Sequence, residues 1–246
     1  MFEKLRTARA VLRSLRVYYG HRPRASAMDR LYGQFVQSGD LVFDVGAHVG
    51  DRVGAFRRLG AKVVAIEPQP ALALTLSAIY GRDRSVTIER RAVGRAAGEI
   101  TLRVNIDNPT VSTASEAFVD AANGAAGWEG QVWGKSIRVP MTTLDALIAT
   151  HGRPAFIKID VEGFEGEALA GLTRPVTALS FEFTTIQRDV AQACIARCAA
   201  LGYAKFNAAL GESQELGEWR AAAEMSRWLE ALPHNANSGD IYARLA

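Results

Sequence analysis

The sequence has little cysteine and no long apolar run. Its 246 residues include two cysteines, Cys194 and Cys198. They are four positions apart in one expected helix, so we interpret them as small buried residues of a reducing compartment rather than as a disulfide or metal site. No apolar stretch approaches the roughly 20 residues of a membrane-spanning helix. Because the first twenty residues lack the apolar core and cleavage site of a secretory signal, we expect a cytoplasmic protein.

Other absences bear on domain count and partners. No Pro/Gly/Ser-rich linker and no repeat divides the chain, and its 48% hydrophobic and 22% charged residues are typical of a globular protein. We therefore expect a helical extension over residues 1–37 and one domain over residues 38–246. The formal net charge is only +3. Since no Lys/Arg block with interleaved aromatics occurs, no nucleic-acid partner is expected.

The first twenty residues form a pattern of their own. Apolar side chains recur there at helical spacing and basic side chains fill much of the rest, which predicts an amphipathic basic helix. Two interpretations stay open: the helix packs on the domain, or it attaches to an anionic membrane, peripherally at the inner membrane face. The apolar positions are Phe2, Leu5, Ala8, Leu12, Leu15 and Tyr19, and the basic ones are Lys4, Arg6, Arg9, Arg13 and Arg16.

Beyond residue 37, short apolar segments alternate with helical patterns. This alternation predicts an α/β fold, with a parallel sheet covered by helices on both faces. An extra strand pair, Ile100–Val104 and Ile137–Pro140, encloses an irregular insertion of about residues 105–135. The expected strands are Leu41–Val45, Lys62–Ile66, Val86–Ile88, Phe156–Ile159, Ala178–Phe183 and Asp240–Leu245, and the expected helices cover residues 26–37, 52–59, 71–80, 165–171, 186–202 and 219–232.

The strongest motif is VFDVGAHVGD, residues 42–51. An apolar strand ends at Asp44, a turn bounded by Gly46 and Gly50 follows, and a helix then begins; ligands bind at such strand ends. The dinucleotide-binding fingerprint has the same outline, but a pyrophosphate requires glycine N–H groups and no nearby carboxylate. Asp44, and His48 in place of the middle glycine, favour a cationic ligand such as S-adenosylmethionine over a nicotinamide dinucleotide.

A second acidic strand end follows about 20 residues later, in the segment AIEP. A carboxylate at Glu67 would accept hydrogen bonds from ribose hydroxyls; its alternative role is to stabilise a helix N-terminus. Ala92 and Val93 would offer backbone and apolar surface to an adenine. The expected cofactor site comprises Asp44, Gly46, His48, Gly50, Asp51, Glu67, Pro68, Ala92, Val93 and Asp160.

Three charged residues alternate at the end of the expected strand 156–159. Lys158, Asp160 and Glu162 share one face, which favours a reaction centre over a core position. Asp160 or Glu162 would take the proton of an alcohol or bind the ammonium group of the methyl donor. A structural cluster is one alternative, and a divalent cation site is another. Because two carboxylates from one strand are few ligands, we prefer a base and assign no metal.

The histidines are ranked separately. His48 lies in the cofactor loop and is a further candidate catalytic group. His234, in a polar loop before the last strand, is a candidate base or sugar contact. We interpret His21 and His151 as ordinary surface residues.

In their order along the chain, these motifs resemble the FkbM-like family of S-adenosylmethionine-dependent methyltransferases. The resemblance implies a Rossmann-like class I methyltransferase fold, with a mostly parallel seven-stranded sheet and a reversed last strand. It also implies O-methylation of a hydroxyl on a sugar, glycan or related secondary metabolite. The matching pieces are FDVGAHVG (43–50), AIEP (65–68), TLD (143–145) and IKIDVEGFE (157–165), with looser matches at SFEF (180–183) and SGD (238–240).

The insertion lies outside these motifs, so we expect it to bind the acceptor. Trp128 and Trp133 offer flat faces on which sugar rings pack; their alternative role is to anchor a surface loop. Two other functions stay open, a nicotinamide-dependent oxidoreductase and a non-catalytic binding module of the same fold. The presence of Asp44, Glu67 and the Asp160/Glu162 pair argues against the second of these.

Overall fold

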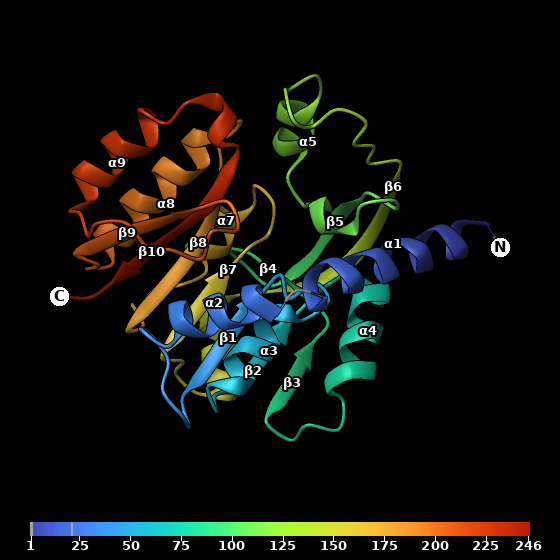
Figure 1. The fold of residues 1–246 in the computed structure, drawn as a ribbon, viewed down its shortest axis with the longest axis horizontal. Coiled ribbons are helices and arrows are strands. Elements are labelled where there is room, and N and C mark those ends of the chain that lie inside the picture. The colour runs from blue at the N-terminus through green and yellow to red at the C-terminus, as the bar shows by residue number, and fades with distance from the viewer. Residues whose placement is uncertain (1, 21) are drawn as a thin grey trace.

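The computed structural model of the protein describes residues 2–20 and 22–246, so His21 lies outside the described residues. A seven-stranded sheet with the order β3-β2-β1-β7-β8-β10-β9 forms its centre (Figure 1). The last strand, β10, runs antiparallel to both neighbours, which confirms the predicted reversed strand. The strands are β1 (Leu41–Val45), β2 (Lys62–Ile66), β3 (Val86–Glu89), β7 (Phe156–Ile159), β8 (Ala178–Thr184), β9 (Lys205–Leu210) and β10 (Ser238–Arg244).

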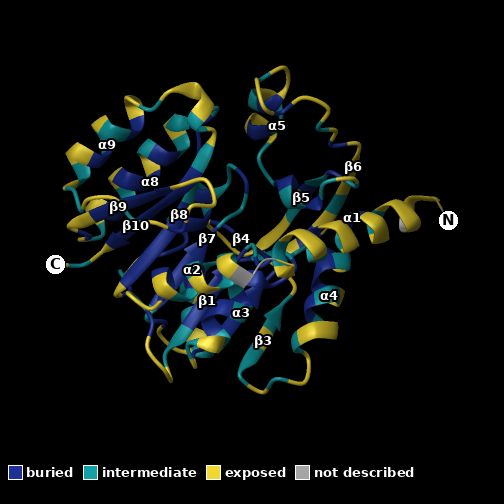
Figure 2. Cartoon of the chain, viewed as in Figure 1, coloured by how far each residue is buried: buried dark blue, intermediate teal, exposed yellow. Residues whose placement is uncertain are grey.

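Helices cover both faces of this sheet. Successive strand residues point to opposite sides, so the apolar strands present a hydrophobic surface to each helix layer. Val42 belongs to the apolar cluster that contains residues of α2, α3 and α4, whereas Phe43 and Val45 belong to the cluster that contains residues of α6 to α9. Figure 2 shows the strands buried between these layers. The helices are α2 (Arg22–Tyr32), α3 (Asp51–Arg58), α4 (Pro70–Tyr80), α6 (Leu144–His151), α7 (Glu165–Ala170), α8 (Arg188–Ala200) and α9 (Ala222–Glu230).

Most of the predicted elements are confirmed. The bounds of β1, β2 and β7 agree with the prediction, since each is an apolar run buried on both faces. The sequence did not predict α6 or β9. Cys194 and Cys198 are free thiols buried in α8, as expected.

The predicted strand pair forms a second, smaller sheet with the order β4-β6-β5. In it β5 (Gly98–Val104) and β6 (Lys135–Thr142) are antiparallel, and β4 (Ala92–Val93) extends the sheet. The insertion between β5 and β6 is not wholly irregular, because it contains η1 (Pro109–Val111) and α5 (Glu116–Ala122). Its aromatic side chains form their own cluster, separate from the main core.

The first residues form the predicted amphipathic helix, α1 (Phe2–Tyr19). One face packs on η1 and α4, with Ala10 and Ser14 buried, and Arg6 pairs with Asp107 of the insertion. The structure therefore shows the packing that we considered first. No helix within the described ranges is long and apolar enough to cross a membrane. Elsewhere along its length α1 exposes large apolar side chains, Phe2, Leu5, Leu12 and Val17.

Candidate active site

A cavity of about 290 Å³ lies at the carboxyl ends of β1, β2, β7 and β8 and the start of β10. This is the edge at which open α/β sheets bind ligands. The structure gathers nearly all predicted site residues around it. Those that line it are Asp44, Gly46, His48, Asp51, Glu67, Pro68, Ala92, Val93, Lys158, Asp160 and Glu162.

Two glycines shape the loop between β1 and α3. Gly46 has φ 84°, and a Cβ atom there would lie 1.7 Å from the carbonyl oxygen of Asp160, so only glycine fits. Gly50 does not line the cavity. A Cβ atom on Gly50 would lie 2.6 Å from Leu76 and 2.7 Å from Tyr80 of α4. The structure thus places Gly50 in helix packing rather than beside the ligand.

Glu67 holds the same loop in place. Its Oε2 accepts the backbone N–H of His48 at 2.9 Å, and its Oε1 accepts that of Gln69 at 2.8 Å. Burial raises the pKa of Glu67 to about 8, while these two hydrogen bonds act to lower it. The carboxylate therefore lies at a fixed position on the cavity wall, where a ribose diol can reach it.

Asp44 is only 1% exposed, and its Oδ2 is buried without a hydrogen-bond partner. Burial raises its pKa to about 7, against the opposing effect of the cations Lys158 and Arg52. A buried carboxylate oxygen without a partner is costly unless a cation or donor meets it. The cavity wall therefore fits the ammonium group of S-adenosylmethionine at this position.

His48 faces the cavity from the loop, as predicted. Its Nε2 lies 3.3 Å from Thr110 Oγ1, and its ring meets the edge of Tyr18 of α1 with centroids 5.4 Å apart. Burial lowers its pKa to about 4, so the imidazole is neutral at physiological pH. The neutral His48 can therefore form a hydrogen bond there, but so low a pKa makes it a weak base near neutral pH.

Lys158 organises the charges at the end of β7. Its buried Nζ lies 2.7 Å from Asp160 Oδ2 and 3.5 Å from Asp240 Oδ1. Burial acts to raise the pKa of Asp160, but Lys158 and Arg52 hold it down at about 2. Burial and then the neighbouring Asp160 raise the pKa of Glu162. Of the predicted acidic pair, Glu162 is thus the better proton acceptor near neutral pH.

Two acidic strand residues of the cavity were not predicted as site residues. Glu182 of β8 and Asp240 of β10 are register partners on adjacent strands, and both line the cavity. They stand in the SFEF and SGD motifs, to which the sequence analysis gave no role. The available signal was a charged residue in an otherwise apolar strand.

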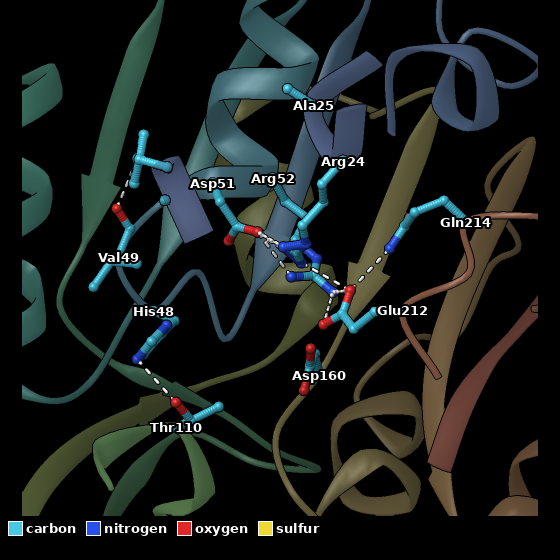
Figure 3. A network of polar contacts seen from close by, with 12 residues as sticks. Arg24, Ala25, His48, Val49, Asp51, Arg52, Thr110, Asp160, Glu212 and Gln214 are labelled. Atoms are coloured by element: carbon cyan, nitrogen blue, oxygen red, sulfur yellow. Dashed lines mark hydrogen bonds and ion pairs between the residues drawn. The ribbon is translucent and has the colours of Figure 1, made fainter. Parts of the chain in front are cut away.

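A network of charges at the cavity wall also went unpredicted (Figure 3). Asp51 pairs with Arg52 at 2.9 Å and with Arg24 at 3.1 Å, and Glu212, from the loop after β9, pairs with Arg24 at 2.8 Å. The guanidinium of Arg24 also lies 4.8 Å from the ring centroid of Tyr18. The network joins the N-terminal helices to a loop near the C-terminus. Because these residues are far apart in the chain, the sequence alone could not predict their contacts.

The two tryptophans of the insertion have different surroundings. Trp128 lines the cavity, and its Nε1 is buried without a hydrogen-bond partner. Trp133 does not line it, and its Nε1 donates to the carbonyl of Val111 at 2.7 Å. Both rings meet Phe118 edge-on. Trp128 is therefore placed to touch a ligand, whereas Trp133 anchors the insertion.

His234 and His151 lie away from the cavity wall. His234 is exposed, and its carbonyl accepts a hydrogen bond from Thr185 Oγ1 at 2.8 Å. Its neighbour Asn237 lines the cavity instead. His151 is half-buried and lies 2.9 Å from Glu89 Oε1, so it is a paired residue rather than a free surface one.

Comparison with known families decides the class of this site. The model of the methyltransferase FkbM domain matches residues 44–230. The chain belongs to the FkbM methyltransferase family. This FkbM protein is an enzyme that uses S-adenosylmethionine, which confirms the resemblance drawn from the motifs and sets aside the nicotinamide alternative.

Solved structures of other methyltransferases are similar to this FkbM protein at low identity. The precorrin-6y C5,15-methyltransferase of Geobacter metallireducens GS-15 has 14% identity and a TM-score of 0.44, with 91% of this chain and 87% of that chain covered. A TehB-like S-adenosylmethionine-dependent methyltransferase of Corynebacterium glutamicum has 12% identity and a TM-score of 0.46, with 89% and 88% covered. An S-adenosylmethionine-dependent O-methyltransferase of Thermotoga maritima has 12% identity and a TM-score of 0.42, with 92% and 66% covered. None of the curated proteins compared with the chain matches it.

Proposed function

We propose that this FkbM-family enzyme methylates a hydroxyl group of a sugar, glycan or related secondary metabolite. The observation that carries the proposal is the group of carboxylates Asp160, Glu162 and Glu182 on the wall of the cavity that holds the cofactor residues. An alcohol is a poor nucleophile until its proton leaves, so a hydroxyl acceptor requires a proton acceptor beside it. This group supplies one.

The chain binds the methyl donor through the residues of the β1 and β2 ends. S-adenosylmethionine supplies an electrophilic methyl group on a sulfonium sulfur. Asp44 binds its ammonium group, and Glu67 accepts hydrogen bonds from its ribose. Ala92 and Val93 line the cavity with apolar surface for the adenine. By fixing the donor, these residues allow in-line placement of the acceptor oxygen.

The acceptor proton passes to Glu162 or Glu182 rather than to Asp160. Asp160 is held ionised by Lys158 and is therefore a weak base, whereas burial and then the charge of Asp160 raise the pKa of both glutamates. A base works best when its pKa lies near the operating pH. This assignment moves the base away from Asp160, one of the two residues first considered.

The acceptor lies against the insertion and the start of β10. Trp128 offers a flat face with an unpaired indole N–H, a combination that suits a ring with both C–H groups and hydroxyls. Thr110, Asn237 and Asp240 add polar groups to the same cavity. Their polar side chains support a polyhydroxylated acceptor over a purely apolar one.

Transfer of a labelled methyl group tests this proposal. The enzyme would be incubated with methyl-labelled S-adenosylmethionine and a panel of mono- and oligosaccharides, with amino and carboxylate analogues for comparison. We expect a methyl ether, which survives alkali, and at least about a hundredfold lower kcat in Glu162→Gln with donor affinity preserved. Label found only in an alkali-labile ester or on nitrogen would contradict O-methylation.

We also propose that the protein is cytoplasmic and contacts the anionic inner membrane face through α1. Two buried free thiols are compatible with a reducing compartment. On α1 the exposed apolar residues Leu5 and Leu12 alternate with the exposed arginines Arg9 and Arg16. Such a surface combines apolar contact with attraction to anionic lipid.

A further inference from the structure

Three carboxylates from two neighbouring strands converge in the cavity. Asp160 and Glu162 follow β7, and Glu182 lies on β8. Because Ile159 pairs with Phe181, the next residues, Asp160 and Glu182, come side by side. One oxygen of each of the three carboxylates lies within 4.8 Å of the others. The sequence offered only two carboxylates from one strand, and the sheet adds the third.

Two of these carboxylates lack a partner of opposite charge. Glu162 is 7% exposed, and its side chain makes no hydrogen bond or ion pair with the described part of the chain. The Oε2 atom of Glu182 is buried without a hydrogen-bond partner. Lys158 pairs with Asp160 and Asp240 and forms no ion pair with either glutamate among the described residues. The group thus holds more buried negative charge than its neighbours balance.

Such an arrangement is stable in only a few ways. Burial disfavours uncompensated charge on both glutamates, so either they bind protons or a cation neutralises them. Three carboxylate oxygens close together match the ligands that hard divalent cations prefer, with water or substrate oxygen completing the shell. Asp160 can join such a site because Lys158 contacts only its Oδ2, and its other side-chain partner, Glu182, belongs to the same group of carboxylates.

We propose that Asp160, Glu162 and Glu182 bind one divalent cation of the magnesium class, and that this cation orients the acceptor hydroxyl. The second part rests on the proposed O-methylation. A bound divalent cation lowers the pKa of a coordinated hydroxyl. A glutamate that binds the cation through one oxygen keeps its other oxygen for the proton that the hydroxyl loses. The methyl carbon then bonds to the acceptor oxygen as its bond to sulfur breaks, with that electron pair left on sulfur.

Direct titration with Mn²⁺, in the absence of donor and acceptor, tests the site. Calorimetry or the electron paramagnetic resonance signal of free Mn²⁺ would measure binding to the full chain. We expect saturable 1:1 binding that Mg²⁺ competes away, weakened at least about tenfold in Glu162→Gln and in Glu182→Gln. Glu165→Gln is the matched control, because Glu165 is also buried but accepts the backbone N–H of Val161 outside the three-carboxylate group. The thermal transition of each variant shows that it is folded.

The possible outcomes separate this inference from the proposed function. If the wild type binds no Mn²⁺ at millimolar concentration, or if both Gln variants bind it as tightly as Glu165→Gln, the cation site is overturned. Methyl transfer that survives EDTA overturns the cation's role while leaving O-methylation in place. Conversely, Mn²⁺ binding lost in the Gln variants, in an enzyme that methylates no hydroxyl acceptor, would support the site and reject the proposed function.

Discussion

Glu67 Oε2 accepts a hydrogen bond from the backbone N–H of His48 at 2.9 Å, which ties the end of β2 to the loop after β1. The same carboxylate that is expected to hold the donor ribose therefore also fixes the loop that carries Gly46. Cofactor affinity and loop geometry depend on one side chain.

Replacement of Glu67 should consequently weaken donor binding more than a lost ribose contact alone. Loss of the Glu67 side chain leaves buried N–H groups and the ribose hydroxyls without an acceptor. An unsatisfied buried group costs about 1–3 kcal/mol, so Glu67→Ala should raise the Kd for S-adenosylmethionine at least about tenfold. Calorimetric titration measures it, with Asp44→Ala as a parallel variant. Unchanged Kd values in both variants would falsify the assignment of the cofactor site.

Donor affinity should depend on pH through Asp44. Its pKa in the folded protein is about 7 because it is buried, so it keeps its proton between about pH 4 and 7, where an unfolded chain would not. Its contribution to stability is full below about pH 4 and is lost as the pH rises to about 7. The affinity of Asp44 for the ammonium group of the donor changes in the opposite direction. It rises with pH, because the ionised carboxylate is the form that binds a cation.

The demethylated donor product, which keeps the ammonium group, is a suitable probe of this pH effect. Its Kd should decrease from pH 6 to pH 8, and Asp44→Asn should bind it more weakly and with a smaller pH dependence. Equal Kd values for the wild type at both pH values would show that Asp44 does not meet the ammonium group.

The two tryptophans of the insertion should respond differently to truncation. Trp128→Ala should raise the KM for the acceptor and leave donor affinity nearly intact, since Trp128 lines the cavity. Trp133→Ala removes a buried ring and its hydrogen bond to Val111, and should lower the free energy of unfolding by about 3 kcal/mol. Steady-state kinetics and denaturant unfolding separate these effects. If Trp128→Ala changes stability alone, the insertion is a structural element.

The outer face of α1 should bind anionic vesicles. Each arginine near such a surface contributes about 1 kcal/mol, and apolar side chains add to this. The double variant Leu5→Glu/Leu12→Glu should pellet less with phosphatidylglycerol vesicles than the wild type. Leu210→Glu is the control, because Leu210 is a 42% exposed apolar residue at the end of β9 rather than on α1.

Substitution is preferable to deletion of residues 1–20, since deletion would also remove Tyr18 from the cavity wall. Equal pelleting of the wild type and the double variant, or equal pelleting on neutral phosphatidylcholine, would count against membrane attachment.

The sequence predicted the centre of the fold better than its edge. The strands β1, β2 and β7 are apolar runs between turn signals, so their bounds could be recognised without tertiary information. In β9, KFNAAL, a lysine and an asparagine interrupt the pattern. Its strand partner is β10, and its other edge has a single bridge, from Phe206 to Arg220. Its assignment depended on a partner nearly 30 residues later in the chain.

The candidate site divides in the same way. Asp44, Glu67 and Asp160 end strands within recognisable motifs, and the structure brings them to one cavity as expected. Glu182 belongs to that site only because β8 lies next to β7, and Tyr18 only because α1 folds back across the loop of His48. Local patterns carry no information about such neighbours.

The position of β10 has a consequence for biosynthesis. On the ribosome, β9 emerges before β10, yet β9 pairs with no other described strand. Until Ser238–Arg244 has left the exit tunnel, the nascent chain therefore exposes the two edges, of β8 and of β9, between which β10 inserts. The other edge of β9 has a single bridge, to Arg220. Unpaired strand edges promote aggregation. We expect a chain truncated before Ser238 to require chaperone protection, and its yield of monomer to fall well below that of the full chain.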